Sequence, residues 1–229
     1  MRSSWQLIDK QAKHPLQDVQ EPNLMRDRFP YHEVPRTVFD GQTVAAQPAD
    51  EFWITDTTFR DGQQARTPYT VEQASTLFDL LHRLSGPNGV IRQSEFFIYS
   101  EKDREILQEI LNKGYRFPEA TAWIRANPRD LELVKEVGIK ETGMLTSISD
   151  YHIFLKLRQN RKSIREHYLT LVKTALDAGI RPRCHFEDVT RADIYGFCLP
   201  LAEELLELSE EAGIPIKIRL CDTLGYGVT

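Results

Sequence analysis

Residues 52–64 read FWITDTTFRDGQQ, and the chain changes character at this stretch. Its first four residues are two aromatic residues followed by two β-branched ones, which predicts a short buried strand. A polar segment follows at once and places Arg60 beside Asp61. In an α/β barrel the carboxyl end of a strand faces the catalytic mouth, so this segment is a candidate site.

Short apolar runs and amphipathic segments alternate from here to residue 229. Further strands are expected near residues 93–99, 119–124, 141–146, 182–187 and 216–221. Helices are expected over residues 71–84, from 101, and over 128–137, 163–178 and 193–212, with stops at Gly114, Gly138, Gly179 and Gly213. This alternation predicts a parallel sheet with helical crossovers. A doubly wound sheet fits it as well as a barrel does, although no GxGxxG follows the first strand.

The first fifty residues lack this periodicity. Five prolines (Pro15, Pro22, Pro30, Pro35 and Pro48) interrupt a polar stretch. We predict that residues 1–50 form an irregular N-terminal extension without chemistry, and that residues 51–229 form the catalytic domain.

Composition excludes several classes of protein. The net charge of −5 comes without a basic stripe, which argues against a nucleic-acid partner. No run of about 18 apolar residues is present, so no membrane span is expected. Cys184, Cys198 and Cys221 stand singly, which indicates reduced thiols in a cytoplasmic protein.

The pair Arg60 and Asp61 carries the most pointed chemistry. A carboxylate can hold a hard divalent cation. A neighbouring guanidinium can bind an oxygen that the cation also polarises. The structural alternative is an ion pair between the two residues that only ties a loop.

Other predicted strand ends carry polar groups too. Glu95 lies inside the apolar run of residues 94–98, where a carboxylate is costly unless it is paired or binds a metal. We predict Arg125, at the end of the third strand, as its partner. His152 and Thr223 follow two later strands. Each has an ordinary structural explanation, but together they indicate one site at the rim of a sheet.

Four motifs, in order, resemble those of the DRE-TIM metallolyase superfamily. DTTFRDGQQ (residues 56–64) is similar to its DTTLRDGEQ signature, with Gln63 in place of the usual Glu. SDYHIFLKL (149–157) resembles SDxHxxxKL, EDVTR (187–191) resembles EDxxR, and CDTLGYG (221–227) resembles DTxGY. The resemblance implies a TIM (β/α)8-type barrel, here incomplete, with about six βα units.

The resemblance also implies a reaction. Members include isopropylmalate, homocitrate, citramalate and Re-type citrate synthases, in which an acetyl-CoA enolate attacks a 2-oxo acid and thioester hydrolysis releases a hydroxy di- or tricarboxylate. It assigns Asp61 to the metal, which we expect to be Mg²⁺ or Mn²⁺ with Zn²⁺ as the alternative. It assigns catalysis to Arg60 and Glu95. Substrate contacts are expected from Arg60, Gln64, Arg125, His152 and Thr223.

Three readings of the function stay open. The SDxHxxxKL-like segment and EDVTR favour a Claisen-condensing acyltransferase over a lyase of the hydroxymethylglutaryl-CoA type. The family's HxH metal ligands and general base are expected beyond residue 229, so this chain is expected to be a truncated or partial form, inactive alone and at most a binding module. When full length, it is expected to be a homodimer. Residues 86–105 are more similar to Re-type citrate synthases or uncharacterised members than to isopropylmalate synthases.

Overall fold

A computed structural model describes residues 20, 22, 38–39, 41–43 and 49–227 of the chain. The chain divides into two units, Met1–Gln47 with Thr229, and Pro48–Val228. In the first unit, the described residues include an antiparallel pair of two-residue strands, β1 (Val38–Phe39) and β2 (Gln42–Thr43). Most of the predicted extension lies outside the described residues, and the boundary at residue 50 stays a prediction.

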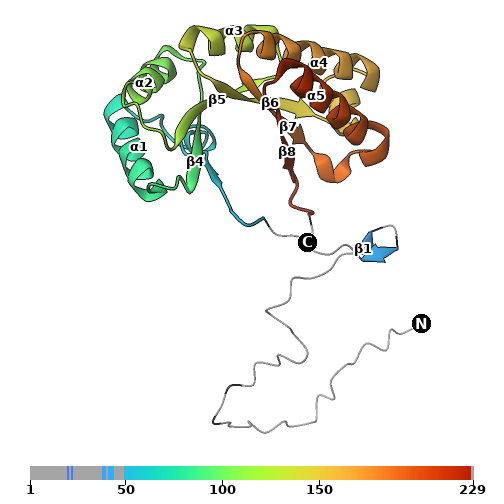
Figure 1. The fold of residues 1–229 in the computed structure, drawn as a ribbon, viewed down its shortest axis with the longest axis horizontal. Coiled ribbons are helices and arrows are strands. Elements are labelled where there is room, and N and C mark those ends of the chain that lie inside the picture. Colours follow the sequence, from blue (N-terminus) through green and yellow to red (C-terminus); the bar gives the residue numbers. More distant parts are fainter. Residues whose placement is uncertain (1–19, 21, 23–37, 40, 44–48, 228–229) are drawn as a thin grey trace, which may run out of the picture. The chain divides into compact units, whose positions relative to one another are not determined.

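The second unit holds a six-stranded sheet with helices between its strands (Figure 1). The strands are β3 (Ile54–Asp56), β4 (Ile91–Phe96), β5 (Glu119–Arg125), β6 (Glu141–Ser147), β7 (Arg181–Glu187) and β8 (Lys217–Cys221). The helices are α1 (Val71–Ser85), α2 (Glu101–Asn112), α3 (Pro128–Val137), α4 (Arg161–Asp177) and α5 (Leu199–Ala212). Every neighbouring pair of strands is parallel.

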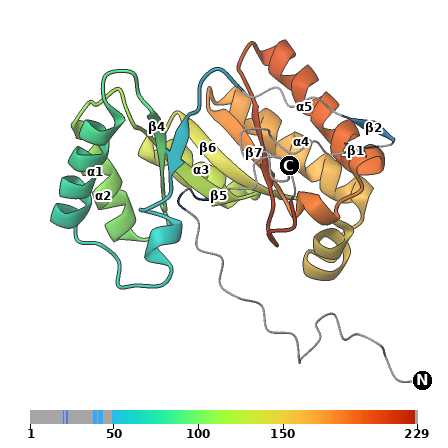
Figure 2. The ribbon, with the colours of Figure 1, turned by 90° about the horizontal axis from the view of Figure 1, so that it is seen from below.

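Strand order decides between the two architectures. The order is β3-β4-β5-β6-β7-β8, so each strand lies beside the next strand in the sequence. A doubly wound sheet reverses direction at a switch point, and this sheet does not. The strands curve with the helices along their outer side (Figures 1 and 2). The predicted fold, an incomplete TIM-type barrel with six βα units, is therefore confirmed.

The helices begin and end where local chemistry favours it. Thr70 caps α1 by accepting a hydrogen bond from the backbone N–H of Gln73 (3.1 Å), while Gln73 bonds back to the N–H of Thr70. Asn127 caps α3, and Pro128 occupies its first turn, where a missing N–H costs nothing. Gly138 ends α3 in the left-handed region at φ 79°.

Two π-type turns were not predicted. The helix expected over residues 193–212 begins with a separate π-type turn, η4 (Ile194–Cys198), before α5. Pro200 in the first turn of α5 has no N–H to donate backwards, so the α-helical bonding restarts there. A second π-type turn, η2 (Tyr151–Lys156), follows β6.

The two faces of the sheet differ in chemistry. Side chains alternate between faces along a strand. On β7, Cys184 and Phe186 join the apolar core beneath the helices, whereas Arg183 and His185 occupy the inner face. The core therefore lies between sheet and helices, and the inner face is polar. No helix within the described residues is long and apolar enough to cross a bilayer.

Candidate active site

The start of the loop after β3 is held by hydrogen bonds and by a ring contact. Asp56 accepts hydrogen bonds from Thr58 and from Ser94 on β4, both at 2.6 Å. Phe59 is buried and stacks on Phe96, with ring centres 4.7 Å apart and planes within 5°. These contacts fix the backbone that leads to Arg60, whose side chain reaches Glu95 on the inner face.

Arg60 makes three contacts there. Its Nε donates to Glu95 Oε2 at 2.9 Å, and its Nη2 donates to Asp61 Oδ2 at 2.7 Å. The guanidinium carbon lies 4.2 Å from the ring centre of Trp123. The side chain is only 12% exposed. Arg60 is thus oriented by its surroundings, as a group that must present a fixed donor requires.

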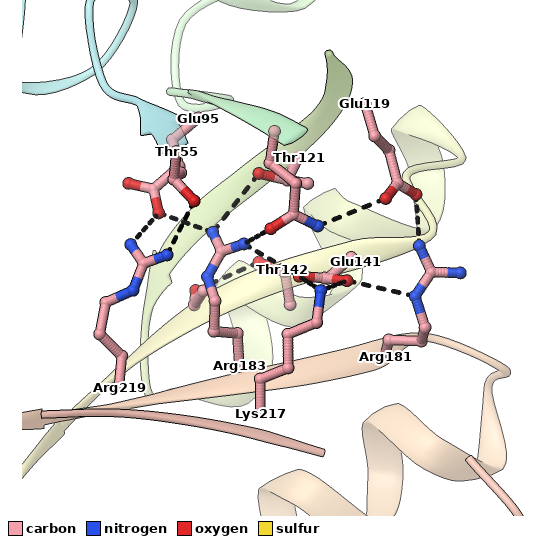
Figure 3. Close-up of polar contacts among 12 residues, drawn as sticks. Thr55, Glu95, Glu119, Thr121, Glu141, Thr142, Arg181, Arg183, Lys217 and Arg219 are labelled. Carbon is pink, nitrogen blue, oxygen red and sulfur yellow. Dashed lines mark hydrogen bonds and ion pairs between the residues drawn. The ribbon is translucent and has the colours of Figure 1, made fainter. Parts of the chain in front are cut away.

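Glu95 has no solvent exposure and bonds to three arginines. While Oε2 serves Arg60, Oε1 accepts from Arg183 at 2.6 Å and from Arg219 at 3.1 Å (Figure 3). Arg219 also donates to Thr55 at 3.0 Å, so one guanidinium on β8 reaches both β3 and β4. The predicted pairing of this buried carboxylate is found, and Arg60, Arg183 and Arg219 make it in place of Arg125.

A second set of ion pairs continues along the inner face from Glu95 (Figure 3). Arg183 bridges to Glu141 at 2.9 Å, and Glu141 also binds Lys217 at 2.8 Å. Arg181 pairs with Glu141 and with Glu119. Burial raises the pKa of Glu141, but the hydrogen bond and charge of Lys217 outweigh it, so the net pKa is lowered. On the inner face, the negative charges of the carboxylates are thus balanced by the positive charges of arginines and a lysine.

His185 lies within this network as a neutral ring. Burial, followed by the charges of Arg183, Arg219 and Arg60, lowers its pKa to about 2. Its Nε2 lies 3.2 Å from Arg183 Nε and its Nδ1 lies 3.4 Å from Trp123 Nε1, and the neutral ring, with one acceptor nitrogen, accepts from one of these two donors. Because the imidazole stays uncharged, it adds no repulsion to the arginines around it.

A cluster centred on Glu187 lies at the carboxyl ends of β6 and β7. The carboxylate of Glu187 accepts from Ser147, from Lys156 at 3.0 Å and from Nδ1 of His152 at 3.0 Å. Burial raises the pKa of Glu187. The hydrogen bonds from Ser147 and Lys156 and the nearby His152 outweigh burial, so the net pKa is lowered. A carboxylate in contact with an imidazole can move a proton at this rim.

Asp188 joins three of the rim loops. Its buried carboxylate accepts from Ser149 at 2.5 Å and from Arg191 at 2.7 Å, while its backbone N–H donates to Thr223 Oγ1 at 2.8 Å. The residue is in the left-handed region at φ 66°. The loops after β6, β7 and β8 are therefore tied together, and Thr223 is positioned by that bond.

The predicted site residues do not all converge. Arg60, Asp61 and Glu95 are in direct contact, and His152 and Thr223 meet in the Glu187–Asp188 region. Gln64 is exposed, one residue beyond the short 3-10 turn η1 (Asp61–Gln63). Whether these residues act on a substrate stays a prediction.

The expected pairing of Arg125 with Glu95 is wrong. Arg125 instead binds Asp130 through Nε at 2.9 Å and Nη2 at 3.0 Å. The two residues are five apart in the sequence, across the turn into α3. Arg125 therefore pairs with this nearby carboxylate and not with one on the neighbouring strand. Asp130 also raises the pKa of Arg125. The Arg125 side chain remains 66% exposed.

Arg125 lines a cavity of ≈ 450 Å³ beside the Glu187 cluster. Ser147 and Lys156, which both hold Glu187, also line it. Its apolar walls include Leu157, Ile164 and Tyr168. The cavity combines an apolar interior with cationic groups, which suits an amphiphilic anion.

The described residues do not by themselves build a divalent-metal site. They contain no group of three or more metal-ligating His, Cys, Asp or Glu side chains. Asp61 is half-exposed, and one of its oxygens is engaged by Arg60. Asp222, at the end of β8, has both oxygens bonded to backbone N–H groups of its own loop, which lower its pKa. Asp61 is the one predicted ligand, and it needs partners outside this set.

The inner-face residues Arg183, Arg219, Trp123 and Glu187 were missing from the predicted site. A signal for them exists in the sequence. RPRCHFE, residues 181–187, places a polar residue at every second position of a predicted buried strand. That period of two identifies one polar face, and it recurs in Lys217 and Arg219.

Comparison with known proteins gives concordant matches. A family model described as HMGL-like matches residues 51–228. The citrate (Re)-synthase of Syntrophus aciditrophicus (strain SB) is 61% identical over 214 residues, which are 93% of this chain and 34% of that protein. The citrate (Re)-synthase of Clostridium kluyveri is 55% identical over 93% of this chain and 47% of its own length. A 2-phosphinomethylmalate synthase of Streptomyces hygroscopicus is 38% identical, over 93% and 49%.

The chain therefore spans between a third and a half of the length of these curated relatives. Among solved structures, the HMG-CoA lyase of Brucella melitensis superposes with a TM-score of 0.57 at 17% identity, over 79% of this chain and 64% of that one. At this identity the likeness shows a shared fold.

Proposed function

The chain belongs to the HMGL-like family, and from this membership we propose that it is part of an acyl-CoA-dependent synthase of the citrate (Re)-synthase type. The substrates would be acetyl-CoA and a 2-oxo dicarboxylic acid. The observation that carries the proposal is Arg60, held by Glu95 and Asp61 at the carboxyl end of β3. The high identity to two citrate (Re)-synthases supports the choice of reaction.

The proposed chemistry places each of these groups in a role. A bond forms between the methyl carbon of acetyl-CoA, after it loses a proton, and the keto carbon of the 2-oxo acid. The keto oxygen becomes an alkoxide and takes up a proton, and water then cleaves the thioester to release CoA. Glu95 binds Nε of Arg60 and Asp61 binds Nη2, so neither carboxylate engages Nη1. Nη1 can therefore donate to that oxygen as negative charge develops on it. Glu95 keeps the guanidinium in place.

The cluster at β7 supports a second role. Glu187 and His152, 3.0 Å apart, can exchange a proton with a substrate at the rim. The neighbouring cavity, with Arg125 and Lys156, would accept the anionic and apolar arm of the acyl-CoA. Gln64 and Thr223 remain proposed substrate contacts.

Several finer points belong to the same proposal. A divalent cation, Mg²⁺ or Mn²⁺ with Zn²⁺ as the alternative, would take Asp61 as a ligand together with groups outside the described set. Residues 1–50 would form an extension, which the start of the family match at residue 51 supports. Three free cysteines support a cytoplasmic location. The active protein would be a homodimer.

The test is a substrate panel. The enzyme that contains this chain is incubated with acetyl-CoA and one of several 2-oxo acids, and the release of CoA thiol and the mass of the product are measured. Oxaloacetate is expected to give citrate and free CoA in equal amounts, and Arg60→Ala is expected to lose at least about a hundredfold in kcat. Release of acetyl-CoA from a 3-hydroxyacyl-CoA, with no condensation, would identify a lyase and overturn the proposal.

A further inference from the structure

The face of the Arg60 guanidinium lies on Trp123. Glu95 binds Nε and Asp61 binds Nη2, through N–H donors that lie in the plane of the guanidinium. In-plane bonds fix where the group's edge lies but leave it free to tilt. The Trp123 ring, whose centre is 4.2 Å from the guanidinium carbon, packs against the group and restricts that freedom. The direction of Nη1 therefore depends on the ring.

Trp123 is itself held from below. Its Nε1 is 3.4 Å from Nδ1 of His185, and the two rings meet edge to face at 84°. His185 is almost fully buried in the inner face. A ring supported by a buried neighbour is a firm platform, unlike a surface side chain that can change rotamer.

Gly143 provides the space for this platform. In the β5–β6 register Gly143 pairs with Trp123, and in the β6–β7 register it pairs with Arg183. A Cβ added at Gly143 would lie 2.6 Å from Trp123 Cδ1 and 2.9 Å from His185 Nε2. The backbone there is not in the left-handed region, so glycine is needed for room and not for conformation.

We propose that Trp123 is a positioning residue for Arg60, and that Gly143 is the residue that lets the indole lie where it does. Trp123 sets the tilt of the guanidinium, and through it the direction in which Nη1 faces the substrate oxygen. The kinetic consequence rests on the proposed condensing function. The orientation of Arg60 does not.

The first experiment therefore reads Arg60 without any reaction. The Nε–Hε signal of Arg60 is recorded by NMR on the full chain and assigned by its loss in Arg60→Lys. The 15N relaxation of this signal measures how rigidly the guanidinium is held, and the wild type is expected to show a high order parameter. Trp123→Phe is expected to keep most of this order, whereas Trp123→Leu and Gly143→Ala are expected to lower the order parameter.

Phe186→Leu is the matched control, because Phe186 is buried on the outer face of β7, away from Arg60. It should leave the Arg60 order parameter unchanged. Trp123 is only partly buried, so Trp123→Leu should fold, and circular dichroism checks this. An Arg60 order parameter unchanged in Trp123→Leu would overturn the proposal.

The second experiment measures rates in the enzyme that contains the chain. Trp123→Leu is expected to lower kcat roughly tenfold, the scale of a desolvated cation–π contact, with less than about threefold change in the KM of the 2-oxo acid. Trp123→Phe should restore kcat to within about threefold. A Phe variant no better than Leu would contradict the positioning role. If wild type condenses no 2-oxo acid, the proposed function fails, and the NMR result still decides the role of Trp123.

Discussion

Three arginines share the carboxylate of Glu95, and its two oxygens are divided between them. Oε2 holds Arg60, and Oε1 holds Arg183 and Arg219. A buried carboxylate of this kind is stable only while its arginine partners remain, because without them its charge would be neither paired nor hydrated. The orientation of Arg60 and the stability of the inner face therefore depend on the same carboxylate.

Glu95→Gln is expected to lower the free energy of unfolding by about 3–5 kcal/mol, since it leaves the arginines uncompensated. Urea unfolding at pH 7 measures it. The control is Asp177→Asn, which removes an exposed i,i+4 pair with Lys173 and should change stability by less than about 0.5 kcal/mol. A loss below about 1 kcal/mol in Glu95→Gln would mean that the buried pairing is far weaker than its geometry indicates.

His185 predicts a particular dependence of stability on pH. Its pKa is lowered to about 2 by burial and by the arginines, whereas in the unfolded chain it returns to about 6.5. Between these values the unfolded state binds a proton that the folded state does not, so stability is fully present above pH 6.5 and falls as the pH is lowered. From pH 6.5 to 5, where most carboxylates stay ionised, the loss due to His185 should be about 1–2 kcal/mol.

Comparing wild type with His185→Gln isolates this contribution, because the other histidines are common to both proteins. Unfolding free energies are measured every half unit from pH 5 to 7. The variant should show a shallower slope. Equal slopes would mean that the folded protein accepts a proton at His185 in this range.

At the scale of secondary-structure elements, the sequence was informative wherever the controlling contacts are local. The bounds of α3, residues 128–137, were predicted without error, because Asn127, Pro128 and Gly138 act within a turn of the helix ends. The π-type turn η4 was missed, because periodicity alone does not register the break at Pro200.

The site was predictable in part for the same reason. Arg60 and Asp61 are neighbours in the sequence, and the motif that contains them stands out. The partners of Glu95 do not, since Arg183 and Arg219 follow it by 88 and 124 residues. Arg125 was assigned the wrong partner because a carboxylate five residues away, Asp130, outcompetes a distant one.

The cap of α1 offers a test at this scale. Thr70→Ala removes the hydroxyl that accepts from Gln73, and we expect a loss of about 1 kcal/mol in the free energy of unfolding. Thr70→Ser retains the acceptor and should recover most of it. Thermal and urea unfolding measure both variants, and an Ala variant as stable as wild type would show that the cap adds nothing in the folded protein.

At the scale of the whole molecule, the apolar core and the polar inner face are separate layers. The core beneath the helices supplies burial, while the inner face holds compensated charges and the candidate site (Figures 2 and 3). The carboxylates of the inner face are paired with arginines and lysines, so few of these carboxylates remain for a metal ion. Asp61 is paired with Arg60 but is half-exposed.

The 229-residue chain is therefore expected to bind Mn²⁺ only weakly. A single carboxylate already paired with Arg60 is a poor site for a divalent cation, which usually needs several oxygen or imidazole ligands. Calorimetric titration with MnCl₂ should give a Kd well above the micromolar range. Micromolar affinity abolished by Asp61→Asn would show that other ligands come together with Asp61.

The division of Glu95 between three arginines also sets an order of events while the protein is being made. Arg60 emerges before Glu95, but Arg183 follows 88 residues later, and at roughly 5–20 residues per second this takes between about 4 and 18 seconds. Throughout that interval the carboxylate must remain hydrated, so the hollow side of the growing sheet stays wet. A nascent chain with a hydrated concave surface exposes less apolar surface to the other nascent chains on the same polysome.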